Sequence, residues 1–164
     1  MSQPCRLPRH IGMKARINNI VGIVPKAFEA ALALHKSAHD CGVPQKTLYL
    51  IALRASQING CSICVDMHSK EMQKADEPFE RIAAVAAWRD TPFFSDAERA
   101  ALALTEAGTR IADREDPVPD ALWNEAAKYY DEKGLAGLVI AIATINVWNR
   151  FNLMTRQIVG SVKW

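Results

Sequence analysis

Apolar residues with helical spacing, interrupted by proline and glycine, are the feature that most restricts the fold of this chain. From Pro25 to about Asp40 the apolar positions follow the helical period, with Pro25 suited to a first turn and Gly42 to a stop. No segment alternates apolar and polar residues with the period of two typical of a half-buried strand. The sequence therefore predicts an all-α fold. Further helices are expected at 44–59, 61–74, 78–88, 95–112, 119–132, 135–148 and 151–158.

The chain of 164 residues is expected to form one domain. Residues 1–24 alternate proline, glycine and basic residues with short apolar pieces, which predicts an irregular N-terminal arm. Residues 25–164 are predicted to form a single helical domain, because a chain of this length hides about two-thirds of its unfolded surface and can build its own core. No secretory signal is visible at the start, so we expect a reducing, cytoplasmic setting.

The charge pattern restricts the class of partner. The net charge of +2 arises from 20 basic and 18 acidic residues spread along the chain, without a basic run. This pattern indicates neither a nucleic-acid surface nor an anionic-membrane surface. The most apolar run, 135–148, is too short to span a bilayer and is predicted to be a buried helix or a subunit interface. The expected partners are small molecules or proteins.

One short stretch carries the chemistry of this sequence. Asn59-Gly60 interrupts the helical pattern, and a new helix is expected to begin at or near Cys61. At about 100° per residue, Cys61, Cys64 and His68 then lie on one side of that helix, with Cys64 and His68 close enough to touch. A Cys-X-X-Cys thiol in the first turn of a helix commonly has a pKa lowered from about 8.5 toward neutrality. The stretch therefore predicts a reactive thiolate beside a base.

A structural zinc site is a different interpretation of the same two cysteines and histidine. All three are ligands that zinc accepts, but a closed tetrahedral site needs a fourth. Only His35, His39 or Cys41 could supply it by folding close to the motif. A redox pair is favoured, because zinc-binding modules usually contain a second paired cluster.

Several parts of the sequence resemble the carboxymuconolactone decarboxylase superfamily, and specifically its AhpD-like alkylhydroperoxidase branch. The Cys-X-X-Cys-X-X-X-His pattern after Asn-Gly is the specific part, and the resemblance covers roughly 25–160. It is carried by Leu53-Arg-Ala-Ser-Gln-Ile-Asn-Gly-Cys-Ser-Ile-Cys-Val-Asp-Met-His68, Ala87-Trp-Arg-Asp-Thr-Pro-Phe-Phe94, Leu102-Ala-Leu-Thr-Glu-Ala107 and Ile145-Asn-Val-Trp-Asn-Arg150.

The resemblance implies an all-helical domain that forms homo-oligomers, commonly trimers or hexamers. It implies a thiol peroxidase or disulfide oxidoreductase that acts in antioxidant defence and needs no metal, flavin or other cofactor. By motif position Cys64 resembles the peroxidatic cysteine, Cys61 the resolving cysteine and His68 a member of the proton relay. The partners implied are a hydroperoxide substrate and a thiol or dithiol electron-donor protein.

One position departs from the AhpD-like pattern. The pattern places a relay glutamate twelve residues before the first cysteine, where this chain has Tyr49. A phenol, with a reference pKa of about 10, is not a general base near neutrality, although it can donate a hydrogen bond. Either His68 works alone or through water, or another carboxylate substitutes, or the peroxidase chemistry is weak.

Other interpretations of the resemblance remain open. The chain could be a disulfide exchanger without peroxidase activity, using the same residues. It could instead be a ring-opening or decarboxylating enzyme like other members of the superfamily, although those relatives usually lack the Cys-X-X-Cys pair. Glu106 lies in a resembling segment and either approaches the active site or is simply exposed.

Overall fold

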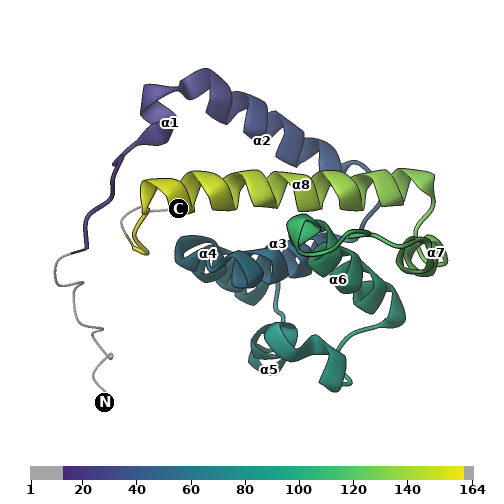
Figure 1. The fold of residues 1–164 in the computed structure, drawn as a ribbon. Helices are drawn as coiled ribbons and strands as arrows, with labels where there is room; N and C mark the ends of the chain where they lie inside the picture. The colour runs from purple at the N-terminus through teal and green to yellow at the C-terminus, as the bar shows by residue number, and fades with distance from the viewer. Residues whose placement is uncertain (1–12, 161–164) are drawn as a thin grey trace, which may run out of the picture.

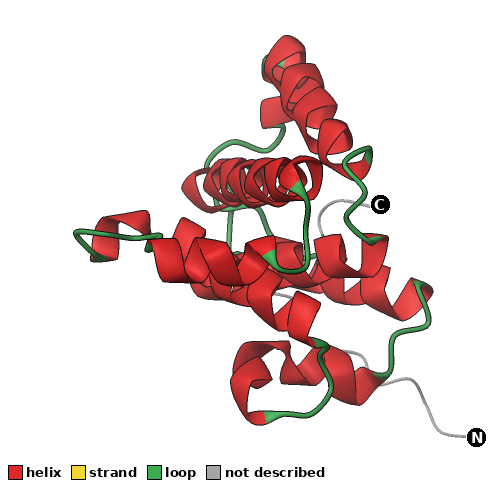
Figure 2. Cartoon of the chain, turned by 90° about the vertical axis from the view of Figure 1, so that its right-hand side faces the viewer, coloured by secondary structure: helices red, strands yellow, loops and turns green. Residues whose placement is uncertain are grey.

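The computed structural model describes residues 13–160, and within that range the chain forms helices joined by short loops, without a strand (Figure 2). The predicted all-α fold is confirmed. The helices are α1 (Ile20–Ile23), α2 (Pro25–His39), α3 (Gln45–Asn59), α4 (Ser62–Lys74), α5 (Phe79–Ala84), the 3₁₀ helix η1 (Val85–Asp90), α6 (Asp96–Thr109), the 3₁₀ helix η2 (Ile111–Asp113), α7 (Asp120–Ala127) and α8 (Glu132–Thr155).

The long helix α8 runs through the middle of the molecule, with α2 packed on one side and α3 and α6 on the other (Figure 1). By length and hydropathy α8 is the one helix among the described residues that could cross a membrane. However, 50% of its most apolar window is buried against neighbouring helices. Such burial is typical of the core helix of a folded domain.

Helix α3 is buried on nearly all sides and supplies the core with both of its apolar faces. Leu48 and Ile51 pack with Leu104 of α6 and Leu138 of α8. Leu50 and Leu53, on another face of α3, belong to a second cluster that includes Met72 of α4 and Trp88 of η1. Because α3 ends directly at the cysteine motif, the motif is attached to the most buried element of the fold.

Two predicted helix boundaries have clear outcomes. The helix start expected at residue 95 is present as a capping box, since the Ser95 hydroxyl accepts from the Glu98 N–H and the Glu98 carboxylate accepts from the Ser95 N–H. The break predicted at Lys133-Gly134 is wrong, because α8 begins at Glu132 and continues through Trp148 to Thr155. The reason is a cap: the Asp131 side chain accepts from the Gly134 N–H at 2.7 Å, which places this glycine in a first helical turn.

The predicted N-terminal arm, 1–24, is described from residue 13 onward, and residues 1–12 and 161–164 lie outside the described range. The described part of the arm is hydrogen-bonded to the C-terminal end of α8. The Arg16 N–H donates to the Thr155 carbonyl at 2.8 Å, and the Gln157 Nε2 donates to the Ile17 carbonyl at 2.7 Å. These bonds hold residues near the start of the chain against the end of α8 (Figure 1).

Candidate active site

A left-handed turn separates α3 from α4 and places the two cysteines. Gly60 has φ of 71°, a conformation that favours glycine, and its N–H donates to the Gln57 carbonyl. The Cys61 N–H donates to the Ser56 carbonyl at 3.0 Å, which completes the end of α3. Helix α4 then begins with Cys61 as its N-cap. The expected turn at Asn59-Gly60 and the helix start at Cys61 are both present.

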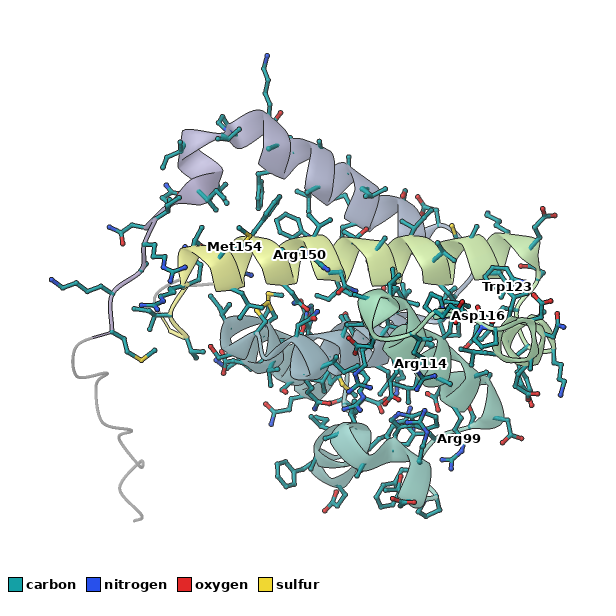
Figure 3. The ribbon with its side chains drawn as sticks, viewed as in Figure 1. Arg99, Arg114, Asp116, Trp123, Arg150 and Met154 are labelled. Atoms are coloured by element: carbon teal, nitrogen blue, oxygen red, sulfur yellow. A yellow bond between two sulfur atoms is a disulfide. The ribbon has the colours of Figure 1, made fainter. Side chains whose placement is uncertain are left out.

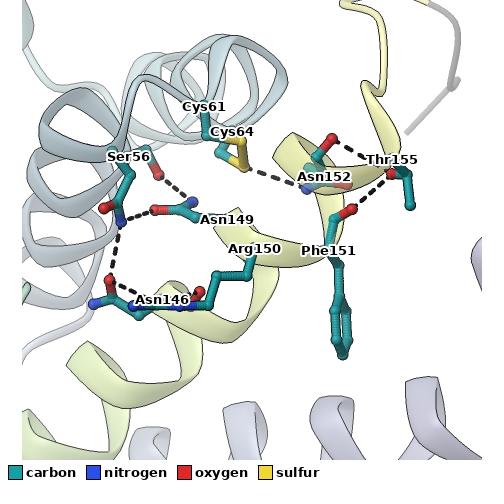
Figure 4. Close-up of a disulfide and its surroundings, with 10 residues drawn as sticks. Ser56, Cys61, Cys64, Asn146, Asn149, Arg150, Phe151, Asn152 and Thr155 are labelled. Carbon is teal, nitrogen blue, oxygen red and sulfur yellow. Dashed lines mark hydrogen bonds between the residues drawn. A yellow bond between two sulfur atoms is a disulfide. The ribbon is translucent and has the colours of Figure 1, made fainter. Parts of the chain in front are cut away.

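Cys61 and Cys64 are joined in a disulfide at the start of α4 (Figure 4), with their Cα atoms 5.3 Å apart. Each residue is only 1% exposed. Cys64 lies in the first turn of α4, near backbone N–H groups that have no partner within the helix and near the positive end of the helix dipole. This position stabilises a negative charge on Cys64 when the disulfide is reduced.

A pocket of about 350 Å³ lies beside the disulfide, and Cys61 is among its lining residues while Cys64 is not. Its walls come from three parts of the chain: the arm at Met13 and Lys14, the start of α4, and the end of α8 from Asn152 onward. Cys61 is therefore the cysteine that contributes to the wall of this pocket, although both cysteines are buried.

His68 lies one helical turn after Cys64 and is only 4% exposed. Its Nδ1 forms a hydrogen bond of 2.6 Å with Glu71 Oε2 on the same helix. Its Nε2 is buried without a hydrogen-bond partner in the described part of the chain. The ring is thus held through one nitrogen, and the other nitrogen is available to a reacting group.

Glu71 is a candidate site residue that the sequence did not single out. Burial by itself would raise the pKa of Glu71, but the hydrogen bond and charge interaction with His68 lower it below its ordinary value, as do the charges of His35 and Lys74. Glu71 is therefore a carboxylate at neutral pH. The spacing of three residues between a histidine and a glutamate on one helix is the sequence signal that would have identified this pair.

Tyr49, at the position of the expected relay glutamate, does not replace that residue at His68. Its side chain packs against the cluster that contains Leu50, Leu53 and Met72. The hydrogen bond at His68 Nδ1 comes from Glu71, on the helix after the turn instead of the helix before it. Of the alternatives for the missing glutamate, the structure favours substitution by another carboxylate.

A stripe of asparagines on α8 faces the end of α3 and the disulfide (Figure 4). The Asn152 Nδ2 donates to Cys64 Sγ at 3.3 Å. The Asn149 Nδ2 donates to the Ser56 hydroxyl at 3.1 Å, and Asn59 donates to both Asn149 and Asn146. These bonds connect α8 to the turn that carries the cysteines, and one of them reaches a sulfur atom directly.

Glu106 is buried, which corrects the expectation that it is exposed or approaches the active site. Its carboxylate accepts from Arg54 at 2.6 Å, from the Trp88 indole at 2.9 Å and from Arg89 at 2.6 Å. Burial by itself would raise the pKa of Glu106, but these hydrogen bonds and the charge of Arg54 lower it. Glu106 therefore ties α6 to α3 and η1 instead of forming part of the cysteine site.

The side chains considered as a fourth zinc ligand form hydrogen bonds with groups outside the cysteine motif. His35 and His39 contact each other, Nε2 to Nε2, at 3.3 Å, and His39 Nδ1 bonds to Gln45 Oε1 at 2.7 Å. The Cys41 thiol donates to the Ser37 carbonyl at 3.3 Å. Across residues 13–160 no group of three or more histidine, cysteine, aspartate or glutamate side chains is arranged to hold a metal ion.

The fold and this site define an all-α thiol protein with a redox-capable disulfide at a helix start. The chain matches the model of the carboxymuconolactone decarboxylase family over residues 25–107. It is 36% identical over 131 residues to the uncharacterized protein YdfG of Bacillus subtilis (strain 168), in a match that covers 80% of this chain and 88% of that protein. The chain belongs to the carboxymuconolactone decarboxylase family.

Solved structures place the fold within the AhpD-like group. A protein of unknown function from Agrobacterium tumefaciens, described as a candidate AhpD antioxidant defence protein, matches with a TM-score of 0.83 and 35% identity. That match covers 92% of this chain and 100% of the other. The debrominase Bmp8 matches with a TM-score of 0.75 and 24% identity, over 86% of this chain and 75% of Bmp8, and this likeness shows the fold alone.

Proposed function

We propose that this chain is a thiol-dependent peroxidase that reduces organic hydroperoxides through Cys61 and Cys64. The observation that carries the proposal is the Cys61–Cys64 disulfide, which lies one helical turn before a buried histidine with an unpartnered nitrogen. The similarity to a protein described as a candidate for antioxidant defence supports the same assignment. The AhpD-like fold adds further support.

In the proposed reaction, His68 Nε2 accepts the proton of the Cys64 thiol in the reduced protein. The Cys64 thiolate attacks an oxygen of the hydroperoxide, the O–O bond breaks, and the alkoxide leaves as an alcohol after taking a proton. Cys64 becomes a sulfenic acid. Cys61 then attacks the sulfenic sulfur, which releases water and forms the disulfide. The hydroperoxide has then been reduced by two electrons, and the two thiols have been oxidised to the disulfide.

Glu71 acts in this proposal as a positioning residue. Its carboxylate accepts the Nδ1–H of His68, which selects the tautomer with a basic Nε2. It also stabilises the imidazolium that forms when His68 takes the thiol proton. Glu71 thereby supplies, from the following helix, the carboxylate that Tyr49 cannot supply.

The catalytic cycle also implies an electron donor and a reducing cellular compartment. An external thiol or dithiol must reduce the disulfide by exchange, and a reducing cytoplasm would provide it. We further propose a homo-oligomer, a trimer or hexamer as the family resemblance implies. Exposed apolar side chains support it, among them Leu34 of α2 and Val139 of α8. Met154, near the end of α8, is exposed as well (Figure 3).

The test is turnover of an organic hydroperoxide by the purified chain with an added dithiol. Wild type should consume the peroxide faster than the uncatalysed mixture, and Cys64→Ser should abolish this activity. Cys41→Ser is the matched control, because Cys41 is the free cysteine of the described residues and hydrogen-bonds only to its own helix. If wild type and Cys64→Ser both proceed at the uncatalysed rate, the peroxidase proposal is wrong.

A disulfide exchanger would give a different result in the same preparation. Its cysteines would titrate reversibly between thiol and disulfide against a redox buffer, but peroxide consumption would stay at the uncatalysed rate. Metal analysis of the purified chain separates both of these functions from a zinc site, which would retain about one zinc ion per chain.

A further inference from the structure

The pocket beside the disulfide is the place where a reducing molecule would act, because Cys61 lines it and Cys64 does not. A volume of about 350 Å³ falls within the usual range of small-molecule sites, about 300–1,000 Å³. Hydrogen bonds at Arg16 and Ile17, just after the lining residues Met13 and Lys14, join the arm to the end of α8 beside this pocket.

Among the described residues that line this pocket, the charged side chains are all basic. Lys14 and Arg156 both line it and are both exposed, while no aspartate or glutamate contributes among the described lining residues. Neither Lys14 nor Arg156 forms an ion pair within residues 13–160. The rest of the wall is largely aliphatic, with Ile63 and Leu153 as examples. A ligand that matches these walls has a short aliphatic body and an anionic group.

We infer that the reductant of this disulfide is a small thiol that carries a carboxylate, bound with its negative charge near Lys14 and Arg156 and its sulfur against Cys61. This inference rests on the thiol–disulfide exchange of the proposed function. It names the class of the electron donor and the sulfur atom that the donor attacks. A small anionic thiol, and not a protein dithiol, is the molecule that the dimensions and charge of the pocket fit.

The exchange balances without another reactant. The thiolate of the small molecule forms a bond with Cys61 Sγ, the Cys61–Cys64 bond breaks, and its electron pair leaves on Cys64. Cys64 is the better leaving group, because its thiolate receives the hydrogen bond from Asn152 and lies in the first turn of α4. A second small thiol then attacks the mixed disulfide, which frees Cys61 and forms the disulfide of the small molecule. Two thiols are oxidised, and the protein gains two electrons.

The test measures reduction of the disulfide in the full chain, without peroxide. Mercaptopropionate, mercaptoethanol and cysteamine are similar in size and carry a negative, neutral and positive charge. Their rates are compared per unit of thiolate and relative to an uncharged model disulfide, which removes differences in intrinsic reactivity. At low salt the anionic thiol should react fastest and the cationic thiol slowest, and added salt should reduce the difference. Mass spectrometry of the trapped intermediate should find the small thiol on Cys61.

Charge-removal variants assign the effect to the pocket. Lys14→Gln and Arg156→Gln should each slow the anionic thiol by roughly two- to fivefold and leave the neutral thiol unchanged. Lys133→Gln is the matched control, because it removes one exposed positive charge at the opposite end of α8, about 35 Å along the helix from Arg156. It should change none of the three rates.

Three results would overturn the inference. They are equal normalised rates for the three thiols, a loss of rate with the anionic thiol in Lys133→Gln as large as in Lys14→Gln and Arg156→Gln, and reduction of the disulfide by a protein dithiol but by none of the small thiols. None of them depends on peroxide turnover. A charge-selective reduction without peroxidase activity would leave this inference standing and refute the peroxidase proposal. Peroxide turnover without charge-selective reduction would support the peroxidase proposal and refute the inference of a small anionic reductant.

Discussion

Removing the amide of Asn152 should make the Cys64 thiolate harder to form. In the structure the Asn152 Nδ2 donates to Cys64 Sγ at 3.3 Å, and Asn152 makes no other side-chain hydrogen bond in the described part of the chain. A hydrogen bond to a charged group contributes about 1.5–3 kcal/mol, and sulfur is a weak acceptor, so the lower end applies. About 1.5 kcal/mol corresponds to roughly one pH unit. In Asn152→Ala the pH midpoint of Cys64 ionisation should therefore rise by about one.

The assay is a pH titration of thiolate ultraviolet absorbance in a Cys61→Ser background, where Cys64 is the motif's only thiol. Cys5→Ser and Cys41→Ser are added to the background, so that neither of the two cysteines outside the motif contributes. Leu153→Ala is the matched control, because Leu153 lines the same pocket wall without bonding to sulfur. Its midpoint should equal that of the background protein.

The expected consequence is kinetic as well. At a pH below the midpoint, a rise of one unit lowers the thiolate fraction about tenfold, and the rate of reaction with an alkylating reagent should fall in proportion. An unchanged midpoint in Asn152→Ala, or an equal rise in Leu153→Ala, would show that the amide does not act on Cys64. A changed unfolding midpoint in urea would indicate instead that the variant is structurally damaged.

Three further predictions concern the carboxylates and the helix cap. Because the pKa of Glu71 is lowered in the fold, its contacts stabilise the protein fully above its ordinary pKa of 4.5, and this stabilisation is lost as the pH falls through the lowered pKa. Glu71→Gln should therefore cost stability at neutral pH and progressively less in acid, as measured by urea unfolding at several pH values. A loss of stability that is independent of pH would contradict this. Glu106→Ala leaves the largely buried Arg54 without its carboxylate partner and should lower the free energy of unfolding by about 3 kcal/mol. Glu125→Ala, in an exposed pair with Lys128, should leave the urea midpoint unchanged. Similar losses of stability in both variants would show that burial does not set the contribution of these ion pairs. Ser95→Ala removes the cap of α6 and should cost about 1 kcal/mol in thermal or urea unfolding, while a Ser95→Asp variant, which keeps a capping acceptor, should cost much less.

Much of the site could be predicted because it depends on contacts close along the chain. The turn at Asn59-Gly60, the start of α4 at Cys61 and the placement of His68 on the same helix face follow from local backbone geometry and the helical period. The hydrogen bond between His68 and Glu71 is equally local, and the three-residue spacing would have revealed it. The family pattern points instead to position 49 on α3, whereas the carboxylate that bonds to His68 lies on α4.

The contacts that set access and charge at the site were decided by tertiary structure alone. Asn152 and Cys64 are 88 residues apart, and the pocket brings Lys14 together with Arg156 from opposite ends of the described chain. Glu106 looks like an ordinary charged helix residue in sequence, yet packing of α6 on α3 buries it beside Arg54. Local periodicity specifies which side of a helix is apolar, but not which other helix covers it. The sequence therefore determined the helices and the cysteine motif, whereas the packing of α8 and the arm determined which cysteine lines the pocket and which charges lie beside it.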